Sequence, residues 1–561
     1  MKGKKILLYL VVIIIFFSLY RLIPIPYPHG IDSFYILERA NAINKLAFMP
    51  WNFDVFATIG MHPLGYPIAA ILFLSLASCL VGVQPYLLIK VIPILILIST
   101  TLLSYLLIRR ITQNVLLFTN YLIFVNLGLY YIIFSNWDFT SRLFLLPLFI
   151  SLLLLINLRY ENAISLTKFS ILLTLVLLLI ALTHRAIFMI LLVTVIPIFV
   201  TQILLLYKQK KQKLVHNLQI YSYSIFFVIL FILPLFNINI LAKLGLEFKF
   251  WEFFFTNSFS SFVYHLGFFS NIAAFVIDCL RYTNLLILFF PLGFLCLLLK
   301  KKKNKFEEYL LVSLFFSAPF FFDREYFLFI YSPFLGLMCM YGLIYMEQIN
   351  LKIMYKNVLF LLLIYLSIGF GSFLTYRNFR PNPNIFQLDD WMGSRTYQVG
   401  SFIKSNSKSN EVTIFNEHAD SWRIKGVFDI NTLRDIDVLQ NLYFVDNLHC
   451  KNIFPANFRE GFRQCNNPFE LISREHYDYP VLYEYLFFVT PDNRNILINT
   501  FNIRYLVLNK EVGMRYQIFF NFQRDDKILI GYYAFVPMYK LNVKEYDVIY
   551  ENGLHILYRL N

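Results

Sequence analysis

The chain has 561 residues, of which 58% are hydrophobic and only 15% are charged. Soluble domains are roughly half apolar and about a quarter charged, so this composition excludes an ordinary soluble protein and indicates a chain that lies largely in a membrane. The net charge is +15, but the basic residues stand in short clusters between apolar runs, which is typical of cytoplasmic loops and argues against a nucleic-acid partner.

The first apolar run, residues 5–23, predicts an uncleaved membrane helix. A signal peptide is the alternative, but no small-residue cleavage site follows the run. Further along the chain, basic clusters are expected in the cytoplasm by the positive-inside rule. These clusters lie at residues 2–5, 109–110, 208–213 and 300–305. The first helix therefore leads outward, and residues 24–66 form a large outer loop.

The remaining apolar runs are predicted to alternate across the membrane. Segments 67–83 and 266–282 do not fit this alternation as full crossings and are therefore expected to be half-helices or re-entrant hairpins. The sequence thus predicts a polytopic α-helical membrane protein with about 11–13 transmembrane helices. The full crossings are predicted at residues 85–108, 114–134, 143–158, 166–183, 186–206, 219–238, 284–299, 308–322, 327–346 and 357–375.

The composition changes after about residue 376, where prolines break a more polar sequence. We expect a transmembrane domain over residues 1–376 and an extracytoplasmic soluble α/β domain over 377–561. Strands are predicted at 411–415 and 503–509, and a hairpin at 546–560 turns at Glu551-Asn552-Gly553. Cys450 and Cys465 could form a disulfide if this domain lies outside the cytoplasm. The sequence contains neither GxxxxGK[ST] nor GxGxxG, which argues against a nucleotide-driven pump.

Asp32 is the first candidate for chemistry, in the outer-loop stretch GIDSFYILERANAI. This stretch has helical character, with Asp32 or Ser33 as the expected N-cap. Helical spacing puts Asp32, Tyr35 and Arg39 on one face and turns Glu38 away. A carboxylate beside an arginine stays ionised at neutral pH and could act as a general base or bind a metal. The alternative is a residue that only caps the helix and pairs with Arg39.

Other ionisable and polar residues lie at predicted outer helix ends. Each of them could have either a functional or a purely structural role. A charged residue at such a depth is a functional candidate, but it could also be a solvated turn, a salt bridge or a side chain that snorkels to the interface. The candidates are His62 and Tyr66 in HPLGYP, Asp138 in SNWDFTSR, His184 and Arg185 in LTHR, and Arg324 in FDREY.

Taken together, these ordered motifs resemble the GT-C superfamily of membrane glycosyltransferases. The resemblance rests on GIDSFYILERANAI, HPLGYP, NWDFTSR, LTHR, an arginine before a YSPFL helix, and a final domain with FNIRYLVLNK and VIYENGLHILYRL. It covers most of the chain. It implies a transfer from a polyprenyl-phosphate or diphosphate sugar to a glycan, lipid or protein acceptor at the outer face of the cell membrane.

The resemblance also implies roles for the candidate residues. Asp32 matches the acidic residue that acts as base or metal ligand, and Asp138 matches the acidic residue of the second outer loop. These two carboxylates would hold a divalent metal, Mg²⁺ or Mn²⁺, if one is used. Donor-phosphate contacts are expected from Arg324, Arg185, His184 and Arg39, and substrate contacts from Tyr35, His62 and Tyr66.

The sequence also departs from subfamilies of this group. It lacks the WWDYG signature of oligosaccharyltransferases, and Asp32 is followed by Ser33 where protein mannosyltransferases have a second acidic residue. Two other functions stay open. A transporter or flippase of lipid-linked saccharides would place charges along a path inside its helices, and a non-catalytic protein of cell-envelope assembly could keep the fold without the activity.

Overall fold

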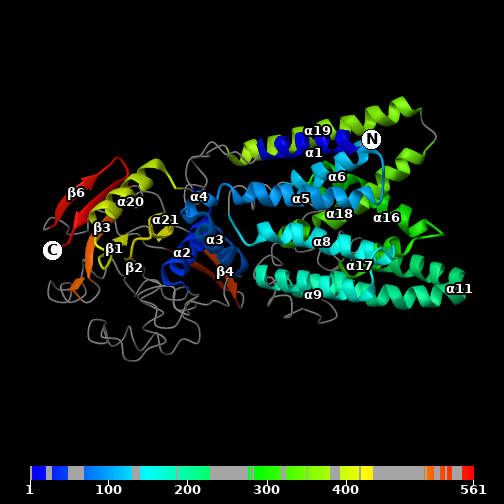
Figure 1. Ribbon diagram of the computed structural model, residues 1–561, viewed down its shortest axis with the longest axis horizontal. Helices are drawn as coiled ribbons and strands as arrows, with labels where there is room; N and C mark the ends of the chain where they lie inside the picture. The colour runs from blue at the N-terminus through cyan, green and yellow to red at the C-terminus, as the bar shows by residue number, and fades with distance from the viewer. Residues whose placement is uncertain are drawn as a thin grey trace. The chain divides into compact units, whose positions relative to one another are not determined.

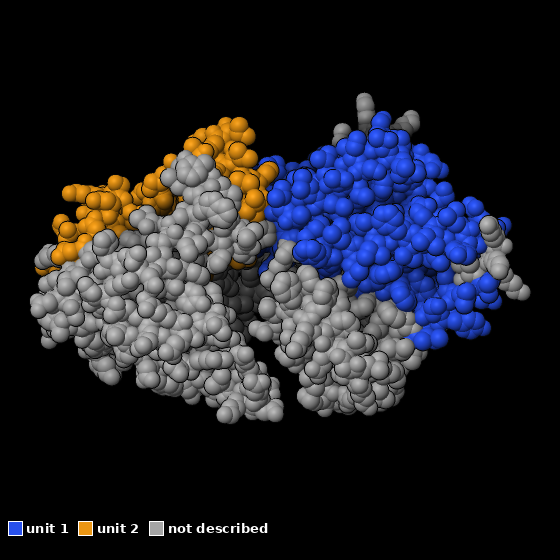
Figure 2. Space-filling model, turned by 90° about the horizontal axis from the view of Figure 1, so that it is seen from below, with its two compact units in different colours: residues 1–24, 91–382 blue, residues 25–90, 383–561 orange. Residues whose placement is uncertain are grey.

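The structure is a computed structural model that divides into two compact units, coloured separately in Figure 2. Unit 1 comprises residues 1–24 and 91–382, and unit 2 comprises residues 25–90 and 383–561. The second unit therefore combines the predicted first outer loop with the C-terminal region. The structure describes residues 3–19, 28, 30–47, 68–128, 139–184, 187–227, 276–277, 279–280, 283–317, 324–349, 352–379, 392–415, 418–433, 498–499, 502–510, 519–524, 527–532 and 546–560.

Unit 1 consists of helices over its described residues (Figure 1). They follow the predicted apolar runs closely, and the helix predicted at 166–183 has those bounds. The elements are α1 (Gly3–Leu19), α5 (Ile92–Arg109), α6 (Val115–Asn126), α8 (Arg142–Tyr160), α9 (Leu166–Thr183), α10 (Ile187–Ile190), the π-helix η2 (Leu191–Val195), α11 (Ile196–Phe227), the 3₁₀ helix η5 (Leu285–Phe289), α16 (Phe290–Leu299), α17 (Lys305–Ser317), α18 (Arg324–Gln348) and α19 (Ile353–Phe379).

Within the described part of the chain, five helices are long and apolar enough to cross a membrane. Two of them, Leu166–Thr183 and Ile353–Phe373, have only 17% of their most apolar window buried inside the protein. Helices that expose this much apolar surface need a hydrocarbon environment, because water would leave the surface uncovered. The chain is thus an integral membrane protein. The five spans are Pro85–Arg109, Arg142–Tyr160, Leu166–Thr183, Ile187–Gln209 and Ile353–Phe373.

The basic cluster at residues 208–213 lies in α11, and the contacts of this helix show that the chain reverses there. Ser313 donates a hydrogen bond to the Val193 carbonyl, and the Phe315 ring lies 5.5 Å from the Tyr223 ring. Residues 193 and 223 thus reach the same level of α17, although 30 residues of straight helix would separate them by about 45 Å. The two arms of α11 therefore run in opposite directions, as a turn between the predicted spans 186–206 and 219–238 requires.

In unit 1, polar and charged residues at the predicted inner ends of the helices form ion pairs and hydrogen bonds with one another. Arg110 after α5 pairs with Glu161 after α8, and Lys208 of α11 pairs with the buried Glu308 of α17. Asn114, the N-cap of α6, donates a 2.6 Å hydrogen bond to Glu347 near the end of α18. The Tyr160 and Tyr309 rings connect the end of α8 to the start of α17. One end of this helix bundle thus gathers the loops that the positive-inside rule groups together.

Helices α16 and α18 approach each other so closely at Gly293 that a larger residue should not fit. A Cβ on Gly293 would lie 1.8 Å from the Met338 carbonyl oxygen, which belongs to backbone and cannot rotate away. We expect Gly293→Ala to destabilise the protein by at least about 1–3 kcal/mol, the range for an overpacked core. The measurement is the thermal unfolding midpoint of the purified protein in detergent.

The matched control for this substitution is Gly369→Ala in α19, where a Cβ meets nothing within 4 Å. Alanine is favoured over glycine in a helix by about 1 kcal/mol, so this variant should keep or raise the midpoint. Equal midpoints for the two variants would contradict the close crossing of α16 and α18.

Unit 2 contains a five-stranded mixed sheet with the order β2-β1-β3-β7-β6. The predicted strands and hairpin are confirmed, and the Asn552 side chain accepts hydrogen bonds from the backbone of Leu554 and His555 at the hairpin turn. The elements are α2 (Ile31–Leu46), α3 (Ile68–Val81), α4 (Pro85–Leu88), α20 (Ser394–Asn406), β1 (Val412–Phe415), α21 (His418–Phe428), β2 (Thr432–Leu433), β3 (Ile503–Asn509), β4 (Phe519–Arg524), β5 (Lys527–Tyr532), β6 (Asp547–Glu551) and β7 (His555–Arg559).

The central strands of this sheet run parallel, and α21 forms the crossover between β1 and β2. Parallel neighbours need such a crossover, because a short turn cannot return the chain to the starting edge. Strand β7 then pairs with β3 in antiparallel orientation, and β6 pairs with β7 in the same way. The apolar helix α3 has 14 residues, or about 21 Å, which is too short for the roughly 30 Å of a bilayer core.

Candidate functional site

The predicted outer-loop helix is present as α2, but it begins earlier than its sequence suggests. Its N-cap is Gly30, at φ 82°, and not Asp32 or Ser33. A glycine adopts this left-handed backbone without strain, which explains why the helix begins at this point. Asp32 is half-buried in the first turn. There the partial positive charge of the helix N-terminus favours the ionised carboxylate.

The predicted faces of α2 are confirmed at Tyr35, Arg39 and Glu38. The Arg39 guanidinium carbon lies 3.8 Å from the centre of the Tyr35 ring, a cation–π contact between residues one turn apart. Glu38 points elsewhere and pairs with Lys425 of α21 at 3.1 Å. Arg39 is only 3% exposed, so in this arrangement its guanidinium is engaged within the protein rather than open at the surface.

Helix α2 is more deeply buried than a surface outer-loop helix. Residues 33–40 are buried except for the half-buried Tyr35. On one side Asn44 exchanges hydrogen bonds with Ser75 and Ser78 of α3. On another side α2 packs against α21, where the Asn41 amide donates a 2.9 Å hydrogen bond to the Gly426 carbonyl. Asp32 thus stands on a helix whose position is fixed by two neighbours.

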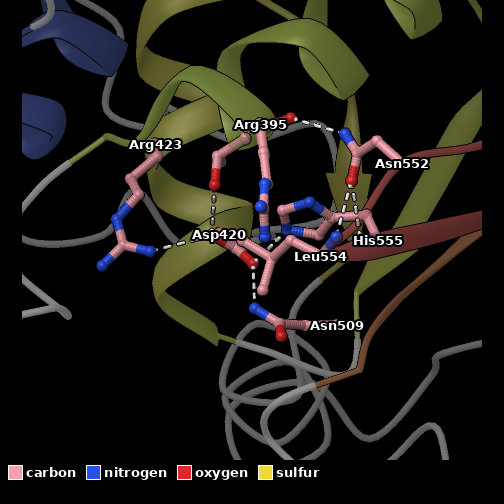
Figure 3. A network of polar contacts seen from close by, with 8 residues as sticks. Arg395, Asp420, Arg423, Asn509, Asn552, Leu554 and His555 are labelled. Carbon is pink, nitrogen blue, oxygen red and sulfur yellow. Dashed lines mark hydrogen bonds and ion pairs between the residues drawn. The ribbon is translucent and has the colours of Figure 1, made fainter.

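The same helix α21 carries a buried carboxylate, Asp420, at the centre of a polar network (Figure 3). One carboxylate oxygen accepts hydrogen bonds from Asn509 of β3 and His555 of β7, both at 2.9 Å. The other oxygen accepts a 2.8 Å hydrogen bond from Arg423 on the next turn of α21. Residues from a helix and two strands thus converge on one charge, which fixes α21 to the sheet.

The network keeps Asp420 ionised. Burial alone would raise the pKa of Asp420, but the hydrogen bond from His555, the positive charge of Arg423 and the hydrogen bond from Asn509 together hold that pKa well below its usual range. An ionised carboxylate can only accept hydrogen bonds, so the His555 Nε2 atom must carry the proton in this contact. The network therefore has one defined set of donors and acceptors around the carboxylate.

The other predicted site residues are placed as follows. His184 follows the last residue of α9 and is buried at 6% exposure, and its backbone N–H donates to Ile180. Arg324 begins α18, and the structure describes its backbone only. His62, Tyr66, Asp138 and Arg185, and also Cys450 and Cys465, lie outside the described residues.

A metal ion would need several carboxylate or imidazole ligands around one point. Among the described residues, no group of three or more His, Cys, Asp or Glu side chains is close enough to hold one. Asp32 is described, while its predicted co-ligand Asp138 is not. The described side chains alone therefore do not fit a metal.

Sequence reasoning missed the part of the site that α21 contributes. Asp420, Lys425 and Gly426 lie in a segment for which no helix was predicted. A signal was present, because this segment has an acidic residue in its first turn and a lysine in its last turn, as helices prefer. The contact between this helix and α2 spans 385 positions in the sequence, and no local pattern predicts such a partner.

Comparisons with known proteins bear on the fold. No family model and no curated protein sequence matches the chain. Solved structures of the oligosaccharyltransferase from Archaeoglobus fulgidus do match it. The structure of its complex with zinc and sulfate superposes with a TM-score of 0.55 at 12% identity, over 90% of this chain and 68% of that chain. The apo form gives a TM-score of 0.53 at 12% identity, over 91% and 70% of the two chains.

A third structure of the same archaeal protein, tethered to an acceptor peptide with an NVT sequon through a disulfide bond, gives a TM-score of 0.51 at 12% identity, over 91% and 70% of the two chains. Identity this low shows the fold alone. The chain therefore has the GT-C-like fold that its motifs predict.

Proposed function

We propose that this chain is a membrane glycosyltransferase that moves a sugar from a polyprenyl-phosphate or diphosphate donor to an acceptor on the outer face of the membrane. The observation that carries the proposal is the GT-C-like fold, which is shared with an oligosaccharyltransferase over about 90% of the chain. The integral membrane helices support it, because a polyprenyl donor is anchored in the bilayer and must be met at its surface.

In the proposed reaction the acceptor hydroxyl oxygen attacks the anomeric carbon of the sugar. The bond from this carbon to the phosphate oxygen breaks, and the polyprenyl phosphate leaves with the bonding electrons. The acceptor proton passes to a general base. A single direct displacement inverts the configuration at the anomeric carbon. The positive side chains that hold the phosphate stabilise the charge that develops on it, which is electrostatic catalysis.

We assign the general base to Asp32. It is half-buried and lies in the first turn of α2, where the helix N-terminus favours its ionised form. Asp138 is proposed as the second acidic residue, and Tyr35, His62 and Tyr66 as contacts to the substrate. Arg324, Arg185 and His184 are proposed to bind the donor phosphate. Arg39 is the weakest candidate for this role, because its guanidinium is buried on Tyr35.

The proposal places the ends of α2 and the sheet of unit 2 outside the cytoplasm, in accord with the positive-inside assignment. The alternative role for Asp32 is that of a metal ligand, in which case Asp32 and Asp138 would hold a divalent ion. The archaeal oligosaccharyltransferase of similar fold was solved in complex with zinc and sulfate, which supports a divalent ion in that protein. The acceptor stays open among glycans, lipids and proteins, but the missing WWDYG argues against transfer to asparagine.

The test is a transfer assay with the purified full chain in liposomes. Polyprenyl-phosphate sugars with a labelled sugar are supplied with glycan, lipid and peptide acceptors. We expect a new glycosidic bond, inverted at the anomeric carbon, together with release of polyprenyl phosphate. Movement of the labelled donor across the bilayer without transfer would instead identify a transporter. If neither bond formation nor movement occurs, the proposed function fails.

A further inference from the structure

The two ends of helix α21 have different partners within unit 2. Its first turn is fixed to the sheet through Asp420, which is bonded to residues of β3 and β7. Its last turn contacts α2 through Lys425 and Gly426. The helix has only 11 residues, about 17 Å at the usual rise of 1.5 Å per residue. A displacement at either end is therefore transmitted to the other end without much bending.

The contact between α21 and α2 allows the two helices little movement relative to each other. The Lys425 ammonium lies 3.1 Å from a Glu38 carboxylate oxygen, and the two side chains are 10% and 6% exposed. Buried charges such as these are strongly unfavourable unless they are paired, so each charge holds the other in place. Beside this pair, a Cβ on Gly426 would lie 2.7 Å from the Phe34 carbonyl oxygen. Only glycine allows α21 to come this close to the backbone of α2.

These contacts lie near the candidate base. Phe34 is two residues from Asp32, and Glu38 is six residues away on the same helix, about 9 Å along its axis. Because α2 is a continuous helix, a shift at Phe34 or Glu38 moves Asp32 with it. A catalytic group displaced by about 1 Å can lose about 10²-fold in rate. The chain offers no flexible linker between the contact and the carboxylate that could absorb such a shift.

We propose that Lys425 and Gly426 are positioning residues, through which the C-terminal helix α21 sets the location of Asp32 on α2. This inference rests on the proposed function and deepens it. The C-terminal region then contributes to the reaction without touching the substrate. The sheet network around Asp420 fixes α21, and α21 fixes the helix that carries the base.

The experiment compares single and combined variants of the buried pair in the transfer assay. Lys425→Met and Glu38→Gln should each lower kcat by about 10–100-fold, while KM for the lipid-linked donor changes by less than about twofold. The charge swap Glu38→Lys with Lys425→Glu restores the pair in the opposite sense and should recover most of the lost kcat. Gly426→Ala should lower kcat in the same way, because its Cβ pushes α2 away.

The matched control uses a second ion pair between the same two segments. Lys45 of α2 lies 3.8 Å from Asp429, which follows α21, but these side chains are 60% and 45% exposed. Exposed pairs contribute about 0–1 kcal/mol, so Lys45→Met and Asp429→Asn should leave kcat within about twofold of the original protein. Equal losses in the buried and the exposed pair would overturn the proposal, as would unchanged kcat in Lys425→Met and Gly426→Ala.

A second measurement does not depend on activity. Amide hydrogen exchange in α2 should accelerate about 10-fold or more in Lys425→Met and return toward the original rate in the charge swap, while exchange in α9 stays unchanged. If the unmodified protein transfers no sugar, the proposed function fails, and exchange in α2 still decides whether α21 holds this helix. If transfer occurs but α2 exchanges at the same rate in all variants, the positioning inference fails alone.

Discussion

Asp32→Asn is expected to lower kcat for sugar transfer by about 10²–10⁴-fold, the contribution of a positioned general base. Asparagine has nearly the same shape as aspartate, so the first turn of α2 should stay intact. Its amide, however, cannot act as a base and take up the proton that the acceptor hydroxyl loses. The KM for the lipid-linked donor should change little, because the phosphate contacts are assigned to other residues. The measurement is steady-state transfer in liposomes at saturating donor and acceptor.

Asp547→Asn is the matched control for this change. Asp547 is exposed in β6 at the edge of the sheet, and neither the proposed chemistry nor its supporting contacts use it. Its variant should transfer sugar at the original rate. If Asp32→Asn also stays within about twofold of the original kcat, Asp32 is not the base, and the catalytic carboxylate must be sought elsewhere in the outer loops.

Asp420→Ala should destabilise the sheet of unit 2 by about 3–5 kcal/mol, the effect of removing one partner from a buried ion pair. Arg423 would keep a buried charge without its carboxylate, and Asn509 and His555 would each lose an acceptor. The free energy of local unfolding can be measured from hydrogen exchange of the β3 and β7 amides. Asp429→Asn serves as control, because that carboxylate is 45% exposed. An equal effect of both changes would show that the network contributes no stability.

The same network should make this sheet sensitive to acid. The pKa of Asp420 is lower in the folded protein than in the unfolded chain. Its stabilising contribution is therefore complete above the ordinary carboxyl pKa of about 3.9 and is lost as the pH falls below that value toward the folded one. Asp420→Asn cannot titrate, so its local stability should fall less steeply over this range. Parallel pH profiles for the two proteins would contradict this role.

The helices of unit 1 and the strands β1, β3, β6 and β7 of unit 2 could be predicted because their determinants are local, whereas β2, β4 and β5 were missed. A membrane helix is recognised by the length of its apolar run, and α9 begins and ends where its run does. Strand β3 likewise matches its predicted bounds. The faces of α2 followed from helical spacing, which places Arg39 on Tyr35 and directs Glu38 away from it.

What could not be predicted depends on partners that are distant in the sequence. The burial of α2 results in part from α21, and the Asp420 contact with His555 joins residues 135 positions apart. The N-cap was misplaced because Asp32 and Ser33 are better capping residues than glycine by side-chain chemistry. The backbone conformation at Gly30 determines the start of the helix instead.

Unit 2 is assembled from two segments that the ribosome makes at very different times. Helix α2 ends at Leu46, whereas its partner α21 ends at Phe428. At a synthesis rate of about 5–20 residues per second, some 20–80 s separate the two. During that interval Glu38 lacks Lys425, the lysine with which it pairs, and α2 lacks its packing partner α21. Helix α2 can therefore reach its final packing against α21 only late in translation, after all the described helices of unit 1 have been synthesised.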